Sequence, residues 1–503
     1  MKAHAKALMR SALAAVLAVA ALAACSTTTG GGDSAEPGSI VVSGTYPVDS
    51  LDPHTAAGGS AGKEFAGQAI YGRLTRPDAK GKIVADLATT WSPDATATTW
   101  TFTLRSGLQF SDGTPLTAED VVASFQRLLA SDSPNKNNFT GAKIEAPDAG
   151  TVVITAAKPD AALPSKLATF FVLPKTVGAD FFKKPVGSGP YVVKSFDPGE
   201  RLVLTANDKY WGGKPKIQTV TVRTIPDVSA RLTALRTGEV DLVWGVPDDQ
   251  LKTLTADAGL KHEAVPSHQV FTMWFNASIP ALASPAVRNA LWKAVDFKTI
   301  IANLYPETGE LAVAPVAPTV FGSSPQQPKS YDPAAAKAEL TTAGFDFGKP
   351  LRLQFANAEF RAFNQAVVSD LAKIGVKIDL QEKEQAVFIK DLLAMNWDIN
   401  FQQLGTAGFD ASSNLGRLYP CSAKRTGYCN AELDKLLAAA GTSTDENARK
   451  ADYAAASKII WDDAVGMYPM TVQIAYVWNK RLDGFTRDAS GYPDFAAATV
   501  GAK

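Results

Sequence analysis

Side chains suited to metal chemistry are scarce in this sequence. Its 503 residues include three cysteines and four histidines. Metal sites in proteins are built from clustered histidines, cysteines and carboxylates. His262 and His268 do not have the i,i+4 spacing that places two ligands on one helical face, and His54 stands alone in a loop. We therefore expect no metal site and no cofactor.

One serine has the sequence context of a catalytic nucleophile. Ser60 lies in the stretch GGSAG (58–62), which matches the Gly-x-Ser-x-Gly pattern of a hydrolase nucleophile elbow. That elbow needs a strand directly before the serine, whereas this stretch follows the loop SLDPH, and no suitable Asp and His follow it in order. We expect a flexible loop here and a chain that is not an enzyme. A secreted serine hydrolase is the alternative from another functional class.

The N-terminus has the features of an export signal. Residues 1–10 are basic, and residues 11–24 form an apolar run that is too short to span a membrane. The run ends at Leu22-Ala23-Ala24-Cys25, which resembles a bacterial lipobox. The resemblance implies that residues 1–24 are a lipoprotein signal peptide and that Cys25 receives the lipid. A plain secretory signal followed by a chance cysteine is the alternative.

Composition indicates an exported globular body behind this signal. Residues 25–38 are rich in Ser, Thr and Gly and predict a flexible tether. Without residues 1–24 the chain has 47 bases against 50 acids, so it lacks the positive charge typical of nucleic-acid-binding proteins. No later apolar run approaches the ~20 residues that span a bilayer. We expect an extracytoplasmic protein, anchored to the cell membrane by Cys25, with no nucleic-acid partner.

The two remaining cysteines lie close together in the sequence YPCSAKRTGYCN. Outside the cytoplasm, an even pair such as Cys421 and Cys429 indicates a disulfide. Closing so short a loop stabilises a protein by roughly 2–3 kcal/mol in the chain-entropy model. Two free thiols are the alternative, and a metal site is disfavoured because no histidine lies near either cysteine.

Predicted strands and helices are mixed along the chain, which indicates an α/β fold. Residues 40–43 predict a strand, and Thr117 with Asp120 forms a capping-box-like start for a helix. Further along, a strand is expected over 376–380 and a last long helix over about 446–465. These elements leave no sign of an internal repeat.

Six segments in a fixed order carry a resemblance to a known family. They are SLDPH (50–54), IYGRLTRPD (70–78), WTFTLRSGLQFSDGTPLTAEDVVASFQRLL (100–129), PVGSGPYVVKSFDPGERLVLTANDKYWGGKP (185–215), RLTALRTGEVDLV (231–243) and FNASIPALASPAVRNALWKAVD (275–296). Together they resemble the peptide/nickel class, family 5, of the extracytoplasmic solute-binding proteins of bacterial ABC transporters. That class includes dipeptide- and oligopeptide-binding lipoproteins.

The resemblance implies a two-lobed periplasmic-binding-protein fold of the type II, Venus-flytrap kind. Lobe I would comprise 39–77, 184–266 and 477–503. A small extra domain on lobe I would comprise 78–183, and lobe II would comprise 267–476. The chain would then cross between the lobes twice, and such crossings act as hinges when lobes close around a ligand.

The resemblance also implies two charged ligand-binding residues in lobe II. Asp410 aligns with the Asp that holds a peptide α-amine in relatives. That amine needs a carboxylate partner because it is charged and buried. Arg361, counted back from Ala372-Lys373-Ile374-Gly375, aligns with the Arg that holds a ligand carboxylate. The alternatives are that Asp410 caps a turn near Ser412 and Ser413 and that Arg361 forms a surface ion pair, with Glu359 nearby.

Four further residues of the same region are candidate ligand contacts. Trp397 and Phe409 could line the pocket, although an aromatic residue on a strand is more often part of the core. The backbone of Gly405 and Gly408 could approach the ligand, since glycine permits close contact. Relatives carry a disulfide shortly after the Asp, which Cys421 and Cys429 match in place. The context Gly408-Phe409-Asp410-Ala411 departs from the family's usual Gly-Asp or Asp-Tyr-Pro.

The resulting functional hypothesis is a receptor and not a catalyst. We expect a lipid-anchored monomer that captures short peptides between its lobes and delivers them to the permease subunits of an ABC importer. The ATPase must be a separate chain, because no Walker A sequence is present. The same role for an oligosaccharide, an opine or a nickel complex is the main alternative, and a solute sensor that works without transport is another.

Overall fold

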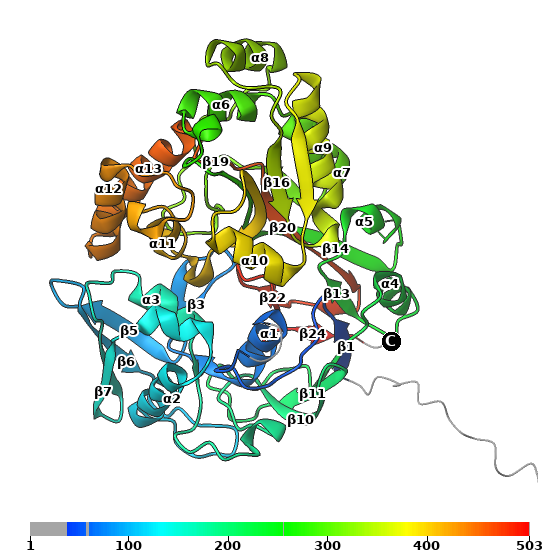
Figure 1. Cartoon of the computed structure of the whole chain (residues 1–503). Helices are drawn as coiled ribbons and strands as arrows, with labels where there is room; N and C mark the ends of the chain where they lie inside the picture. The colour runs from blue at the N-terminus through cyan, green and yellow to red at the C-terminus, as the bar shows by residue number, and fades with distance from the viewer. Residues whose placement is uncertain (1–37, 57–59, 255, 502–503) are drawn as a thin grey trace, which may run out of the picture. The chain divides into compact units, whose positions relative to one another are not determined.

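The computed structural model describes residues 38–56, 60–254 and 256–501. The predicted signal peptide and Cys25 therefore lie outside the described residues. A twelve-stranded sheet runs through the described chain (Figure 1). Its strands, in spatial order, are β10 (Tyr191–Asp197), β11 (Arg201–Ala206), β12 (Thr219–Arg223), β1 (Ser39–Ser43), β13 (Leu242–Trp244), β20 (Met470–Asn479), β14 (Leu260–Phe275), β18 (Ile399–Gly405), β16 (Leu351–Phe355) and β17 (Ile378–Glu382), with β15 (Gly309–Leu311) beside β20 and β19 (Gly466–Met467) beside β14.

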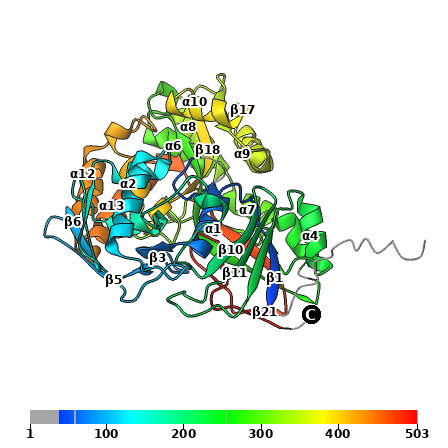
Figure 2. The same ribbon diagram turned by 90° about the horizontal axis from the view of Figure 1, so that it is seen from below.

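Lobe I is built around β1, as residues 40–43 predicted. This strand pairs in parallel with β12 on one side and β13 on the other, and all five of its residues are buried. A strand that is buried on both faces needs a continuous apolar run, which SIVVS supplies. Figure 2 shows β10 and β11 side by side, and β12 lies between β11 and β1 in the sheet. The remaining elements of lobe I are α1 (Ser60–Ile70), α4 (Val228–Arg236), α5 (Asp248–Leu254), β21 (Leu482–Asp483), β22 (Thr486–Arg487), β23 (Pro493–Asp494) and β24 (Thr499–Val500).

Two long antiparallel strands, β14 and β20, lead from lobe I into lobe II. Residues Leu260–Pro266 of β14 pair with β20, and residues Gln269–Phe275 pair with β18 of lobe II. The register between β14 and β20 shifts between Pro266 and Val270. Proline has no N–H to donate to a neighbouring strand, so it is tolerated at such an irregularity. The two crossings of the chain therefore lie side by side in one sheet.

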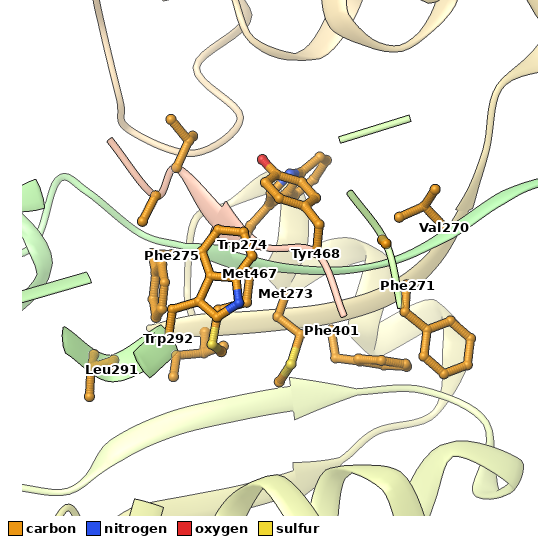
Figure 3. Close-up of a cluster of buried hydrophobic side chains, with 14 of the residues drawn as sticks. Val270, Phe271, Met273, Trp274, Phe275, Leu291, Trp292, Phe401, Met467 and Tyr468 are labelled. Carbon is orange, nitrogen blue, oxygen red and sulfur yellow. The ribbon is translucent and has the colours of Figure 1, made fainter. Parts of the chain in front are cut away.

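Lobe II surrounds the largest hydrophobic core of the chain. Trp274 of β14 donates its indole N–H to the Tyr419 hydroxyl at 2.9 Å, and Trp292 packs edge-on against Trp461 with ring centroids 4.7 Å apart. Figure 3 shows Trp274, Trp292 and Tyr468 in this cluster. The helices of lobe II are α6 (Pro285–Lys293), α7 (Phe297–Leu304), α8 (Pro333–Thr342), α9 (Arg361–Lys373), α10 (Gln385–Leu393), α11 (Leu415–Leu418), α12 (Ala431–Thr442) and α13 (Glu446–Asp462).

The small domain is a four-stranded antiparallel sheet with a helix packed on it. Helix α2 (Ala118–Ala130) begins where the capping residues predicted, and the Thr117 N–H donates to the Asp120 carboxylate at 2.8 Å. Phe102 and Phe125 lie in the core of this domain. Its elements are β3 (Thr75–Pro77), β4 (Ile83–Ala85), β5 (Ala88–Pro93), β6 (Thr99–Leu104), β7 (Lys143–Asp148), β8 (Thr151–Thr155) and α3 (Leu163–Lys166), and β2 (Gly72–Arg73) pairs with β9 (Phe171–Val172) at its base.

The buried hydrophobic residues of the described chain form four clusters. One lies within residues 270–470, a second joins residues 40–222 with 242–244 and 476–498, a third lies within residues 74–172, and a fourth joins Val41 with residues 232–254 and 475–477. The contacts of residues 38–503 nevertheless keep them in one compact unit. The residue boundaries of the lobes stay a prediction. No helix of the described residues is both long and apolar enough to cross a membrane.

Two predicted elements have a boundary elsewhere, and the reason in each case is the C-terminal turn of a helix. The strand expected at 376–380 begins at Ile378, because the Val376 N–H is still used to close helix α9 by donating to Leu371 O. The last helix ends at Asp462 and not at 465. There, Ala464 has a φ of 42° and the Val465 N–H donates back to Ile460 O. Both turns are helix-ending arrangements that sequence periodicity does not detect.

The predicted disulfide between Cys421 and Cys429 is present. It closes a loop between α11 and α12, and the Cys421 N–H donates to the Asp434 carboxylate at 2.9 Å. The loop contains Lys424 in the left-handed conformation, with a φ of 47°. The cross-link therefore fixes a short irregular segment that has little regular structure of its own.

Removal of this cross-link should lower the stability of lobe II. The double variant Cys421→Ser/Cys429→Ser is expected to lose about 2–3 kcal/mol of unfolding free energy, because the unfolded loop regains conformational freedom. Urea unfolding followed by tryptophan fluorescence measures the loss. Ser422→Ala, in the same loop, is the matched control. A double variant as stable as this control would contradict the prediction.

His54 is a buried structural residue at the contact between lobe I and the small domain. Its side chain is 2% exposed, its ring stacks on Phe170 at 5.7 Å, and its Nε2 donates to Phe171 O at 3.0 Å. Burial first, and then the charge of Arg127, lower the pKa of His54 to about 4. The neutral ring is therefore the form that fits the folded protein.

This histidine should make the fold sensitive to acid. In the unfolded chain His54 takes up a proton near pH 6.5, whereas the folded protein resists protonation down to about pH 4. Stability is therefore lost as the pH falls through this window, by up to about 3 kcal/mol. His54→Gln keeps a donor near Phe171 and does not titrate. Urea midpoints at pH 7.5 and 4.5 should differ less in this variant than in the parent, and an equal difference would rule out His54 as the cause.

Candidate functional site

The small domain and lobe II touch one another beside the end of β18. The Ala161 N–H of the small domain donates to Gly441 O of lobe II at 2.9 Å. Gly408 of lobe II, with a φ of 71°, lies so close that a Cβ there would be 3.0 Å from Ser165 O. A Cβ on Gly81 would overlap Thr319 O outright. Glycine at 81 and 408 thus permits two backbones to approach more closely than any side chain would allow.

Two cavities flank this contact, and each has walls from both sides. The larger has a volume of about 880 Å³ and is lined by Asn135 and Lys166 of the small domain and by Gly405 and Arg417 of lobe II, among others. The smaller, of about 480 Å³, is lined by Trp100 of the small domain and by Phe321, Asp410 and Arg449 of lobe II, among others. Sites for small ligands are typically cavities of this size between two structural units.

Asp410 lies at the smaller cavity, directly after the short turn that follows β18. Its neighbours on both sides bond to Phe321: the Phe321 N–H donates to Phe409 O at 2.8 Å, and the Ala411 N–H donates to Phe321 O at 2.9 Å. These bonds hold Asp410 in place, and the residue is 1% exposed. Because its backbone is fixed on both sides, the carboxylate has a defined direction.

The carboxylate of Asp410 already has three partners within the chain. Oδ2 accepts from Arg449 Nη2 at 2.7 Å. Oδ1 accepts from the Ser412 N–H at 2.9 Å and from the Tyr453 hydroxyl at 3.3 Å. The turn contact with Ser412 matches the alternative to ligand binding, and Arg449 already supplies a positive partner to the carboxylate. The amine-binding role of Asp410 stays a prediction, and it requires that Arg449 be exchanged for the ligand.

Arg361 is the first residue of α9 and forms an exposed ion pair. Its Nε and Nη2 donate to the two carboxylate oxygens of Glu382 at 2.6 and 2.8 Å. The acid is not Glu359, the neighbour in sequence, but Glu382 at the end of β17. The side chain of Arg361 is 52% exposed. Its carboxylate-binding role also stays a prediction, and it would require the pair with Glu382 to open.

The two aromatic candidates are buried among protein side chains. Trp397 is fully buried in the core of lobe II, and its indole N–H donates to Leu392 O at 3.3 Å. Phe409 is 5% exposed and packs edge-on against His268 with ring centroids 5.1 Å apart. Both therefore make the core contacts that are usual for aromatic residues near strands, and their role as ligand contacts stays a prediction.

Gly405 and Ser60 fall at two different kinds of position. Gly405 lines the larger cavity, and a Cβ there would be 2.9 Å from Nε2 of His268. Ser60 is the first residue of α1, and the Gly-x-Ser-x-Gly stretch lies partly outside the described residues.

Within residues 38–56, 60–254 and 256–501, no group of three or more His, Cys, Asp or Glu side chains is placed to hold a metal ion.

The sequence did not single out Arg449, Tyr453 or Arg417. Arg449 and Tyr453 lie one turn apart on α13, so their side chains face the same way, and that spacing was a usable signal. Their partner Asp410 comes from a distant segment, which the spacing could not reveal. Arg417 has no such signal, because α11 is a single turn within an irregular region.

Two titratable groups of lobe I have raised pKa values. Burial first, and then the charge of Glu359 in lobe II, raise the pKa of Tyr46, which follows β1. Glu64 on α1 is exposed to water, yet surrounding protein and then Asp488 raise its pKa to about 7. The Glu64 carboxyl group therefore lies among protein groups while it stays in contact with water.

A third cavity, of about 650 Å³, lies within lobe I and the base of the small domain. Arg73 stands there between two carboxylates, 4.0 Å from Asp86 and 3.9 Å from Asp488. Burial raises the pKa of both acids. No residue of lobe II lines this cavity, so we do not take it as the site between the lobes.

The chain forms two α/β lobes joined by paired strands, and two of its cavities have walls from both the small domain and lobe II. This arrangement defines a solute-binding protein of the two-lobed type. The chain belongs to the bacterial extracellular solute-binding proteins, family 5, whose family model matches residues 82–426. The family and the fold predicted from the six segments are thereby confirmed. The family consists of the substrate-binding components of ABC transporters.

Known relatives differ in what their names say they bind. The chain is 29% identical to the probable D,D-dipeptide-binding periplasmic protein DdpA of Escherichia coli (strain K12), over 80% of this chain and 82% of that protein. It is 26% identical to the nickel-binding periplasmic protein of the same organism, over 71% and 73%. In structure it is similar to the periplasmic murein tripeptide-binding protein MppA in its unliganded open form, with a TM-score of 0.80 and 26% identity over 93% of this chain and 98% of that one.

The ion pair between Asp410 and Arg449 should be important for stability. Asp410→Asn keeps the shape but leaves the Arg449 guanidinium, whose side chain is 7% exposed, without a counter-charge. Breaking a buried pair in this way costs about 3 kcal/mol or more of unfolding free energy. The matched control is Asp462→Asn, which removes the same charge from an exposed pair with Lys458 and should cost less than about 1 kcal/mol. Equal urea midpoints for the two variants would contradict the prediction.

Proposed function

We propose that this chain is the lipid-anchored, monomeric receptor of an ABC importer and that it captures short peptides between its two halves. The peptide leaves the receptor chemically unchanged and passes to the permease. The main support is the position of the two cavities, because each has walls from the small domain and from lobe II. A ligand that contacts both walls stabilises the closed arrangement over the open one.

Charged groups of lobe II suit the two ends of a peptide, although only Asp410 of the two predicted residues lines one of these cavities. In this proposal Asp410 binds the amine after Arg449 gives way, and a cation of lobe II binds the carboxylate. Arg361 is one such cation, provided that its pair with Glu382 opens. The D,D-dipeptide and murein-tripeptide names of two relatives support a peptide ligand.

A metal chelate is the second candidate ligand. The name of the nickel-binding relative favours it. In this case the metal arrives inside a small organic molecule that supplies its ligands, and the protein contacts that molecule. His54 is buried, and its Nε2 is engaged with Phe171 O, so it does not serve as a contact to such a chelate in this proposal.

Binding of defined peptides tests the proposal. The mature chain without its lipid should bind some members of a mixed di- to pentapeptide panel with 1:1 stoichiometry in calorimetric titration. Mass spectrometry of the gently purified protein should show a peptide carried over from the cell. Nickel with histidine and nickel with citrate are the comparison ligands. If a chelate binds and no peptide does, the peptide assignment is wrong.

Blocking the peptide amine tests the role of Asp410. N-acetylation should weaken binding at least tenfold in the parent, because a neutral amide cannot replace the charged amine beside the carboxylate. The same acetylation should change little in Asp410→Asn. If the parent binds free and acetylated peptides equally well, Asp410 serves only Arg449 and the local turn.

A further inference from the structure

Arg417 faces the larger cavity and lacks an anionic partner. It lies in α11, lines the 880 Å³ cavity and is exposed to water. Its Nε donates to Ser413 O at 3.0 Å, which fixes the base of the guanidinium. Among the residues that the structure describes, no carboxylate lies within ion-pair distance of Arg417. The outer edge of the guanidinium is therefore available to a ligand.

A second guanidinium increases the positive charge at this position. Arg425 lies in the disulfide-closed loop 421–429, and it too has no acid within ion-pair distance in the described part of the chain. Burial first, and then the charge of Arg425, lower the pKa of Arg417. Two cations that are near each other and partly removed from water are unfavourable unless an anion joins them.

The remaining charges of the cavity do not offset this excess. Lys166 and Asp160 form a 2.6 Å ion pair across the small-domain wall and cancel each other. Lys158, on the same wall, has no carboxylate within ion-pair distance among the residues described. The facing residues Asn135 and Asn137 are neutral amides that both donate and accept hydrogen bonds. The cavity thus combines net positive charge with hydrogen-bonding groups on the opposite side.

We infer that the larger cavity takes a ligand bearing a carboxylate and that Arg417 is the residue that binds it. A guanidinium matches a carboxylate with two parallel N–H donors, and its planar fork is already oriented here by Ser413. The asparagines of the small domain then contact the amide groups of the same ligand beside that carboxylate. This inference rests on the proposed function. It assigns the carboxylate of the peptide to Arg417 in place of Arg361, because the guanidinium of Arg361 is already bonded to Glu382.

The test compares carboxylate and amide forms of the same peptides. The parent, Arg417→Gln and Arg417→Lys are titrated by calorimetry with a tripeptide as the free acid, as the C-terminal amide, and with Glu or Gln as an internal residue. Arg236→Gln is the matched control, because Arg236 is an exposed arginine of lobe I bonded to Thr253. The Glu/Gln pair distinguishes a side-chain carboxylate from the C-terminal one.

We expect Arg417→Gln to weaken binding of the carboxylate form at least tenfold and to leave the amide form within about twofold. Arg417→Lys should recover part of the loss, and Arg236→Gln should bind like the parent. If the parent binds the acid and the amide equally, or Arg417→Gln weakens both alike, the inference is wrong while the peptide receptor stands. If the parent binds no peptide in any form, the proposed function fails and the assignment to Arg417 falls with it.

Discussion

Strands β14 and β20 join the two lobes through backbone hydrogen bonds, and the rest of the architecture depends on that pairing. Each lobe has its own hydrophobic core, so the cores alone would not hold the lobes in register. The paired strands do so, because every residue from Leu260 to Pro266 has a fixed partner between Gln473 and Asn479. The register shift after Pro266 is the one interruption in that described pairing, and a sheet bends most easily where its ladder is interrupted. The register shift after Pro266 is therefore the place in the paired strands where a bend costs least.

The contact between the small domain and lobe II has a different character. It includes hydrogen bonds and close backbone approaches at glycines. Ala161 bonds to Gly441, and Arg449 reaches Ala161 O at 3.5 Å while it pairs with Asp410. Contacts of this kind can be broken and remade at low cost, because each polar group finds water when the surfaces part. The strands β14 and β20 hold the two lobes together through continuous backbone pairing, whereas the contact between the small domain and lobe II is weaker. A protein that closes around a ligand and opens again needs both features.

Much of the fold could be predicted from the sequence because its signals are local. The apolar run at 40–43 and the capping residues Thr117 and Asp120 each determine an element through neighbours in the chain. Element ends were less predictable where a helix closes with bonds to its last turn, as at Val376 and Val465. The candidate site was least predictable. Asp410 could be placed near a cavity, but its partner Arg449 lies 39 residues later, and only packing brings the two together. Arg361 lies beside Glu359 in sequence, yet the parallel pairing of β16 and β17 presents it with Glu382.

The loop closed by Cys421 and Cys429 carries Arg425 beside the cavity that holds Arg417. Formation of that bond depends on an oxidising compartment. A copy of the chain retained in the reducing cytosol would keep both thiols free, and Arg425 would then lie in a loop without its cross-link. The fixed position of Arg425 beside Arg417 therefore depends on the redox state of the surroundings.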